Sequence, residues 1–154
     1  AAQFAALTGR EYGLFEAYRM EDAEIALVLI GSSAGTAKVT VDALRARGIP
    51  AGLVKIRVFR PFPAEELAQT LKNVKALAIL DKAESFSAQG GPLFAEVRAA
   101  LYDLEPRPRT VGYVYGLGGR DITPAHFASV FARLEAIAAG GELGPVYSHL
   151  GQRG

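Results

Sequence analysis

An unbroken apolar run, Ile25–Ile30, is the feature that most constrains how this chain can fold. A run of this length predicts a strand covered on both faces, and such strands lie inside α/β sheets. Small, turn-compatible residues follow at 31–36, and apolar residues with helical spacing come next. Strand, glycine-containing loop and helix together predict the first unit of a three-layer α/β domain.

Strand and helix patterns alternate along the rest of the chain. We expect strands at 14–20, 25–30, 53–59, 76–80 and 111–115, and helices at 36–47, 64–71, 92–101 and 124–139. Such alternation predicts a mostly parallel sheet with right-handed crossovers. We interpret 1–12 as a linker, 13–140 as one α/β domain and 141–154 as an irregular tail.

The segment 14–20 is open to two interpretations. Its aromatic residues favour a strand, but its apolar residues also fit a helical period. As a strand it would lie at the sheet edge and form a hairpin with 25–30, because antiparallel neighbours need only a short connection.

Composition excludes several classes of function. The chain has 154 residues, half of them hydrophobic, so a single domain is expected. Its net charge is +1 and its acidic and basic residues are intermixed, so we expect no charged surface for binding nucleic acid or an anionic membrane. It has no cysteine, which excludes disulfides, thiolate zinc sites and iron–sulfur ligation from within the chain. We predict a cytoplasmic protein and, since the chain does not begin with methionine, a piece excised from a longer polypeptide.

Loops that follow the predicted strands are where a site is expected, because ligands of such sheets bind outside the carboxyl ends of the strands. The candidate interface or ligand residues are Gly31, Ser32, Ser33, Gly35, Arg60, Asp81, Lys82, Gly118, Gly119, Arg120 and Asp121.

Known motifs fit these loops poorly. The loop at 31–38 lacks the adjacent glycine, lysine and hydroxyl residue of a phosphate-binding P-loop, and 116–120 lacks the third glycine of the dinucleotide fingerprint. The helix start after Gly31 could still bind an anion through free backbone donors.

Charged and aromatic residues near the strand ends suggest contacts rather than catalysis. Asp81, Lys82 and Glu84 are interpreted as a charged cluster suited to salt bridges or an interface. Tyr113 and Tyr115 are residue types common at interfaces. The histidines, His126 and His149, have no metal-binding spacing, so we predict no catalytic residue and no metal site.

Several stretches resemble the thiamine-diphosphate-dependent 2-oxoacid:ferredoxin oxidoreductases, most closely the alpha subunit of pyruvate:ferredoxin oxidoreductase. They are GREYGLFEAYRMEDAE at 9–24, GSSAGTAK at 31–38, KIRVFRPFP at 55–63, LDKAESFSAQGGPLFAEV at 80–97 and YGLGGRDIT at 115–123. Family members often have arginine where Lys82 stands, which leaves the charge unchanged.

The resemblance implies a second domain like the carboxy-terminal domain of transketolases, with a five-stranded mixed sheet in the order 1-3-2-4-5 and an antiparallel first strand. It implies an enzyme that converts pyruvate and coenzyme A to acetyl-CoA while reducing ferredoxin. Thiamine diphosphate and iron–sulfur clusters would be bound by other domains or subunits, and these would be the partners of this chain.

Two hypotheses follow for the chain itself. It is a structural and docking module of such an oxidoreductase, for pyruvate or for a different 2-oxoacid. Alternatively, it is a small-anion or cofactor-binding domain acting on its own, with ligands at the loops near Gly31 and Arg120.

Overall fold

The computed structural model describes residue 3 and residues 6–7, 13–86 and 89–151. Most of the predicted linker 1–12 and the last three residues of the predicted tail lie outside these ranges. The strands are β1 (Phe15–Tyr18), β2 (Ile25–Ile30), β3 (Ala51–Ile56), β4 (Ala76–Asp81), β5 (Arg109–Tyr115) and β6 (Tyr147–Leu150). The helices are α2 (Ala34–Ala46), α3 (Ala64–Leu71), α4 (Pro92–Leu101) and α5 (Pro124–Ala138), with a 3-10 turn η1 at Leu117–Gly119.

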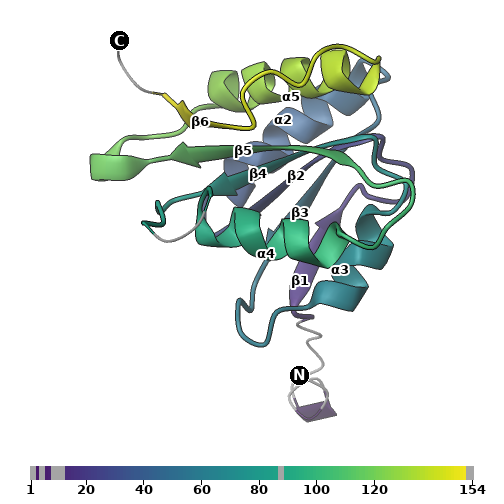
Figure 1. Ribbon diagram of the computed structural model, residues 1–154, viewed down its shortest axis with the longest axis vertical. Coiled ribbons are helices and arrows are strands. Elements are labelled where there is room, and N and C mark those ends of the chain that lie inside the picture. Colours follow the sequence, from purple (N-terminus) through teal and green to yellow (C-terminus); the bar gives the residue numbers. More distant parts are fainter. Residues whose placement is uncertain (1–2, 4–5, 8–12, 87–88, 152–154) are drawn as a thin grey trace.

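A single mixed sheet forms the middle layer, with strand order β1-β3-β2-β4-β5-β6. Helices α2 and α5 cover one face, and α3 and α4 cover the other (Figure 1). Only β1 is antiparallel to its neighbour; the other pairs are parallel. The three-layer α/β fold, the interior position of β2, the order 1-3-2-4-5 and the strand interpretation of 14–20 are confirmed.

The predicted hairpin between the first two strands is wrong. β1 pairs with β3, so that Phe15 lies opposite Ile56, and β2 is the next strand beyond β3. The connection between β1 and β2 therefore crosses the start of β3, where it packs on Gly52. A Cβ there would lie 2.9 Å from that of Ala23 and 3.0 Å from the carbonyl oxygen of Arg19. Glycine at position 52 provides the space for this crossing.

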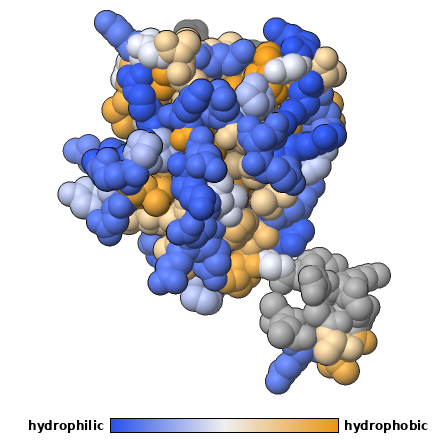
Figure 2. Space-filling model, turned by 90° about the vertical axis from the view of Figure 1, so that its right-hand side faces the viewer, coloured by the Kyte–Doolittle hydropathy of each residue, from blue (hydrophilic) through white to orange (hydrophobic). Residues whose placement is uncertain are grey.

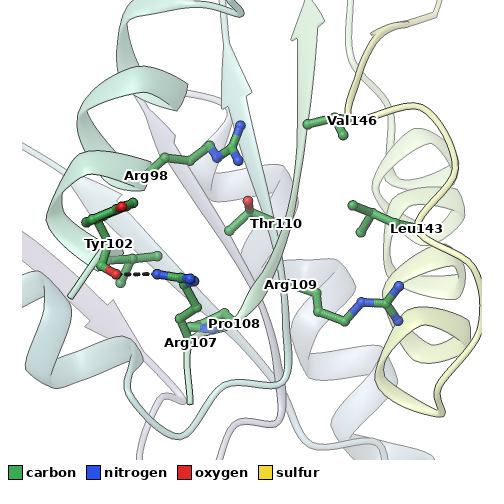
Figure 3. A pocket seen from close by; sticks show the side chains of 9 residues that line it. Arg98, Tyr102, Arg107, Pro108, Arg109, Thr110, Leu143 and Val146 are labelled. Carbon is green, nitrogen blue, oxygen red and sulfur yellow. Dashed lines mark hydrogen bonds between the residues drawn. The ribbon is translucent and has the colours of Figure 1, made fainter. Parts of the chain in front are cut away.

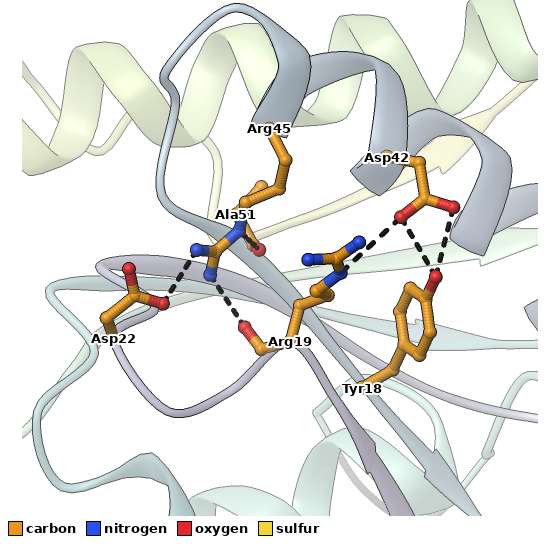
Figure 4. Close-up of polar contacts among 6 residues, drawn as sticks. All are labelled: Tyr18, Arg19, Asp22, Asp42, Arg45 and Ala51. Carbon is orange, nitrogen blue, oxygen red and sulfur yellow. Dashed lines mark hydrogen bonds and ion pairs between the residues drawn. The ribbon is translucent and has the colours of Figure 1, made fainter.

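Polar contacts of Arg45 fix the same connection to α2 (Figure 4). Its guanidinium donates to the carbonyl oxygens of Ala51 and Arg19, both at 2.7 Å, and to the carboxylate of Asp22 at 2.6 Å. One side chain thus joins the end of α2, the start of β3 and the chain that leaves β1. This contact set stabilises the edge strand without direct pairing between β1 and β2.

Each face of the sheet has its own hydrophobic core. Alternate residues of β2 point to opposite faces, so Leu27 and Leu29 pack beneath α2 and α5 while Val28 packs beneath α3 and α4. All three side chains are fully buried. The continuous apolar run is thus explained by a strand with helices on both sides.

A sixth strand corrects both the predicted strand count and the irregular tail. Tyr147–Leu150 pairs in parallel with β5, and the ring of Tyr147 lies 5.4 Å from that of Phe94 between centroids. A Cβ at Gly112 would lie 2.6 Å from the Phe94 ring and closer still to Tyr147, so glycine is what lets the two rings meet above β5. The strand is short and its sequence has little apolar alternation, so the local pattern does not predict it. Packing on other elements stabilises it instead.

Candidate functional site

The carboxyl ends of β2, β3, β4 and β5 meet at one edge of the sheet, as their parallel pairing requires. The loops after β4 and β5 lie on the left in Figure 1. At this edge β2 and β4 are neighbours, yet the helices that follow them, α2 and α4, cover opposite faces. Such a divergence point is where ligands of open α/β sheets usually bind.

A hollow of about 330 Å³ opens at this divergence point. Its lining is mainly apolar and includes Ile30, Phe59, Leu80 and Leu93. Gly31 and Lys82, which directly follow the neighbouring strands β2 and β4, also line it. We refer to it as the switch-point hollow. It brings together the exits of β2, β3 and β4 and the first turn of α4.

Asp81 ends β4 and points toward α4. Its carboxylate accepts the backbone N–H groups of Leu93 at 2.8 Å and Phe94 at 3.0 Å, so it serves as the N-terminal cap that α4 lacks at Gly91. Burial raises the pKa of Asp81, and the two amide hydrogen bonds oppose that shift. The side chain is 5% exposed, and both oxygens are engaged by the helix. We therefore assign it a structural role.

Lys82 turns to the other face of the sheet. Its ammonium group lies 5.5 Å from the centre of the Tyr115 ring. Glu84 instead contacts His149 on β6, with 2.6 Å between Oε1 and Nε2. The three charged residues therefore have separate contacts: Asp81 caps α4, Lys82 lies over the Tyr115 ring, and Glu84 forms the kind of salt bridge predicted for this cluster, with His149.

The predicted residues of the first loop form the start of α2. Gly31 has φ +96°, a left-handed conformation that favours glycine. Ser33 is buried at the N-cap position but its side chain makes no capping hydrogen bond. Ser32 is exposed between them, and Gly35 lies in the first turn of the helix.

Arg60 follows β3 on the α4 side of the edge. It forms an ion pair with Glu96 of α4 at 2.6 Å and stacks over the Phe59 ring at 4.3 Å. Its guanidinium is exposed, so this pair contributes little to stability.

The loop after β5 contains the remaining predicted residues. Gly118 and Gly119 have left-handed φ angles of 68° and 74°, which allow the tight turn η1. Arg120 donates weakly to the carbonyl oxygen of Gly151 at 3.4 Å, and Asp121 is exposed. A second hollow of about 400 Å³ separates this loop from β6.

The two tyrosines predicted as interface residues are in the core. Tyr113 is 6% exposed and Tyr115 is 2% exposed. The Tyr113 hydroxyl accepts a hydrogen bond from Arg133 at 2.8 Å. Alternation along β5 directs both rings beneath α5, which residue type alone does not indicate.

At the strand-exit edge the structure adds three exposed apolar residues that the sequence did not point to. Ile30, Phe86 and Leu117 follow or end β2, β4 and β5, and Phe86 is completely exposed. Phe86 stands among small and polar residues in a long loop, and that contrast is the sequence signal that could have identified it.

The opposite edge, where the parallel strands begin, has a different character. Hydrophilic residues cover much of this side (Figure 2). It contains a hollow of about 360 Å³ with arginines at its rim (Figure 3). Arg107 donates to the carbonyl oxygen of Tyr102 at the end of α4, and Arg109 donates to Gly141 at 2.7 Å just beyond α5. These cations complete helix ends and have structural roles.

In the part of the chain that the structure describes, no group of three or more histidine, aspartate or glutamate side chains could hold a metal ion. No helix in that part is long and apolar enough to cross a membrane.

Known proteins similar in sequence to this chain include subunits of 2-oxoacid oxidoreductases. The chain is 49% identical over 133 residues to pyruvate synthase subunit PorA of Methanothermobacter thermautotrophicus, covering 86% of this chain and 33% of that protein. It is 39% identical over 142 residues to ketoisovalerate oxidoreductase subunit VorA of Pyrococcus horikoshii, covering 92% of this chain and 36% of that subunit. The chain therefore spans about a third of the length of these relatives.

A solved structure supports the fold. The 2-oxoglutarate:ferredoxin oxidoreductase of Magnetococcus marinus aligns over 88% of this chain and 21% of its own, with a TM-score of 0.58 and 20% identity. Residues 23–127 also match the family model for pyruvate:ferredoxin oxidoreductase core domain II. This chain belongs to the pyruvate:ferredoxin oxidoreductase core domain II family.

Proposed function

We propose that this chain is the second domain of the alpha subunit of a cytoplasmic 2-oxoacid:ferredoxin oxidoreductase, and that it acts there as a docking domain. The complete enzyme would convert a 2-oxoacid and coenzyme A to an acyl-CoA and carbon dioxide while reducing ferredoxin. Pyruvate is the favoured substrate, because the pyruvate synthase relative shares 49% of aligned residues and the ketoisovalerate relative 39%. Reduction of ferredoxin by the complete enzyme with pyruvate, compared with 2-ketoisovalerate, tests this choice.

The cofactors of such an enzyme do not fit this chain. Iron–sulfur clusters require thiolate ligands, and the sequence has no cysteine. The most buried carboxylate, Asp81, is already bound to α4. We therefore assign thiamine diphosphate and the clusters to other domains or subunits, and no catalytic step to these residues.

Exposed apolar side chains at the strand-exit edge are the observation that carries the docking proposal. Ile30 and Leu117 are 38% and 40% exposed, and Phe86 is fully exposed. They rim an edge that also contains the apolar switch-point hollow. Ile30 lines this hollow, and exposed apolar groups at one edge of a domain are typical of protein interfaces.

Assembly of the complete oxidoreductase with a Phe86→Ser variant tests this proposal. We expect the variant to be recovered with fewer partner subunits while the fold of this domain is retained, since the ring contacts solvent in the free chain. Tyr102→Ser is the matched control, because Tyr102 is 70% exposed at the opposite edge. Equal assembly of both variants and the wild type would exclude this edge as the docking surface.

A further inference from the structure

We propose that the hollow between the end of α4 and the start of β5 binds the oxyanion group of a small molecule, a phosphate or a carboxylate, through Arg98, Arg107 and Thr110 (Figure 3). The hollow has a volume of about 360 Å³, which is within the range of small-molecule sites. It lies at the edge where the parallel strands begin, opposite the strand exits. This inference goes beyond docking and does not depend on it.

The charges that line this hollow are all positive. Three arginines, Arg98, Arg107 and Arg109, contribute to the lining, and none of the described residues that line it is acidic. Among the described residues, the one carboxylate that pairs with these arginines is that of Glu105, which lies 3.8 Å from Arg107 on a side chain that is 80% exposed. Like charges around one hollow repel one another, and a bound anion would remove that repulsion.

Helix ends account for only part of this charge. The carboxyl ends of α4 and α5 lie beside the hollow, since Arg107 donates to a carbonyl at the end of α4 and Arg109 donates to one just beyond α5. Each helix end carries roughly half a negative charge, so the two ends and Glu105 together balance about two of the three arginine charges. The remaining positive charge is the one that an anion would neutralise.

Arg98 is the arginine whose donors are free. Its guanidinium makes no hydrogen bond or ion pair within the described residues, and it lies 5.2 Å from the centre of the Phe94 ring. In Figure 3 its side chain extends from α4 toward β5. A guanidinium that stacks on an aromatic face keeps its N–H groups available in its own plane, where they can bind two oxygens of one anion.

Thr110 and Arg107 supply further donors. The Thr110 side chain lines the hollow from β5, and its hydroxyl makes no hydrogen bond in the part of the chain that the structure describes. Arg107 is fixed by its bond to the carbonyl oxygen of Tyr102 and by its position over the Tyr102 ring, 5.3 Å from the centre. That bond uses Nη1, so the other guanidinium nitrogens can donate to a ligand. A side chain that is already fixed loses little freedom on binding.

The other side of the hollow is apolar. Leu143 and Val146 lie across it from Arg98 and Arg107 (Figure 3). Val146 is 38% exposed, so its side chain can contact a ligand. A cationic side and an apolar side together match a small molecule that combines an anionic group with a hydrocarbon part.

Titration of the purified chain with inorganic phosphate tests the site, with sodium chloride at equal ionic strength as the reference. We expect saturable changes in the backbone amide NMR signal of Thr110 and in the side-chain Nε–H signal of Arg98. Arg98→Gln should weaken binding about tenfold or more, since it removes charged donors. Arg47→Gln is the matched control, because Arg47 is an exposed arginine just after α2 that does not line the hollow.

Thr110→Val provides a second variant that keeps the branched side chain and removes only the hydroxyl. It should weaken binding severalfold and leave the dispersion of the amide spectrum unchanged. A parallel titration with acetate identifies the source of the anion: preference for phosphate indicates a phosphorylated small molecule, and preference for acetate indicates a carboxylate ligand.

Absence of saturation with both anions, or equal affinity of the wild type and Arg98→Gln, would overturn the proposal. Equal weakening by Arg98→Gln and Arg47→Gln would also overturn it, because general attraction to a positive surface would then explain the binding. These measurements concern the edge opposite the docking surface, so their failure leaves the docking proposal unaffected. Conversely, normal assembly of Phe86→Ser would not alter the anion titration.

Discussion

The carboxylate of Asp81 and the backbone of Gly91 lie in direct contact, so that β4 and α4 meet where residue 91 has no side chain. A Cβ at position 91 would lie 2.6 Å from the Cβ of Asp81 and closer still to its carboxyl group. The backbone angles of Gly91, φ −73° and ψ 170°, are open to any residue. Space, and not backbone freedom, therefore requires glycine at this position.

Gly91→Ala should destabilise the chain by about 1–3 kcal/mol, the range for overpacking a filled site. The added methyl group must displace Asp81 and weaken its hydrogen bonds to α4. Urea unfolding measures the effect. Gly35→Ala is the control: nothing lies within 4 Å of its added Cβ, and alanine in a helix should gain about 0.5–1 kcal/mol. Similar effects of the two substitutions would contradict the packing described here.

Asp81 and Glu16 should give stability a pH dependence of opposite sign. Burial raises the pKa of Asp81 above its usual 3.8, so its contribution is complete below pH 3.8 and is lost as pH rises through the raised pKa. The hydrogen bond from Lys38 is the largest influence that lowers the pKa of Glu16 below its usual 4.5. Its contribution is complete above pH 4.5 and is lost as pH falls through the lowered pKa.

Asp81→Asn and Glu16→Gln separate these two contributions. We expect the unfolding free energy of the wild type minus that of Asp81→Asn to decrease with rising pH, and the corresponding difference for Glu16→Gln to increase. Urea unfolding between about pH 3 and 6 covers both windows. Differences that change in the same direction would show that one of the two environments is misassigned.

Leu27→Ala and Leu29→Ala should each cost about 2–5 kcal/mol, because truncating a buried leucine removes apolar contacts and leaves a cavity. Both side chains have no exposed surface beneath α2 and α5. Ile30→Ala is the control in the same strand, since Ile30 is 38% exposed and should cost less. Losses below about 1 kcal/mol for both leucines would place them outside the core.

Arg120→Ala should change the stability of this chain by less than about 1 kcal/mol, because its exposed guanidinium makes one long contact, 3.4 Å, with Gly151. We expect the same variant to reduce assembly or turnover of the complete oxidoreductase. Arg47→Ala, an exposed arginine just after α2, is the control at the opposite edge. Unchanged assembly and turnover would remove the functional role of Arg120, and a large loss of stability would make it a structural residue.

Local pattern alone predicted much of the fold. Helices α3 and α4 begin and end at the residues expected from proline and apolar spacing, and the run 25–30 identified the interior strand. The strand-exit edge also followed from the alternation of elements, because parallel pairing places all exits together. The family resemblance supplied what the pattern did not, the antiparallel pairing of β1 with β3.

Tertiary contacts decided the remaining features. β6 exists because Gly112 leaves space for Tyr147 beside Phe94, and these residues are far apart in the sequence. Asp81 was interpreted as part of a charged cluster, but its carboxylate accepts backbone hydrogen bonds from the first turn of α4 and caps that helix. Residue order encodes which faces of a strand or helix are apolar, since that depends on periodicity. Which residues a strand edge, a glycine or a carboxylate contacts depends on which distant elements pack together. This packing is determined only when the two cores form.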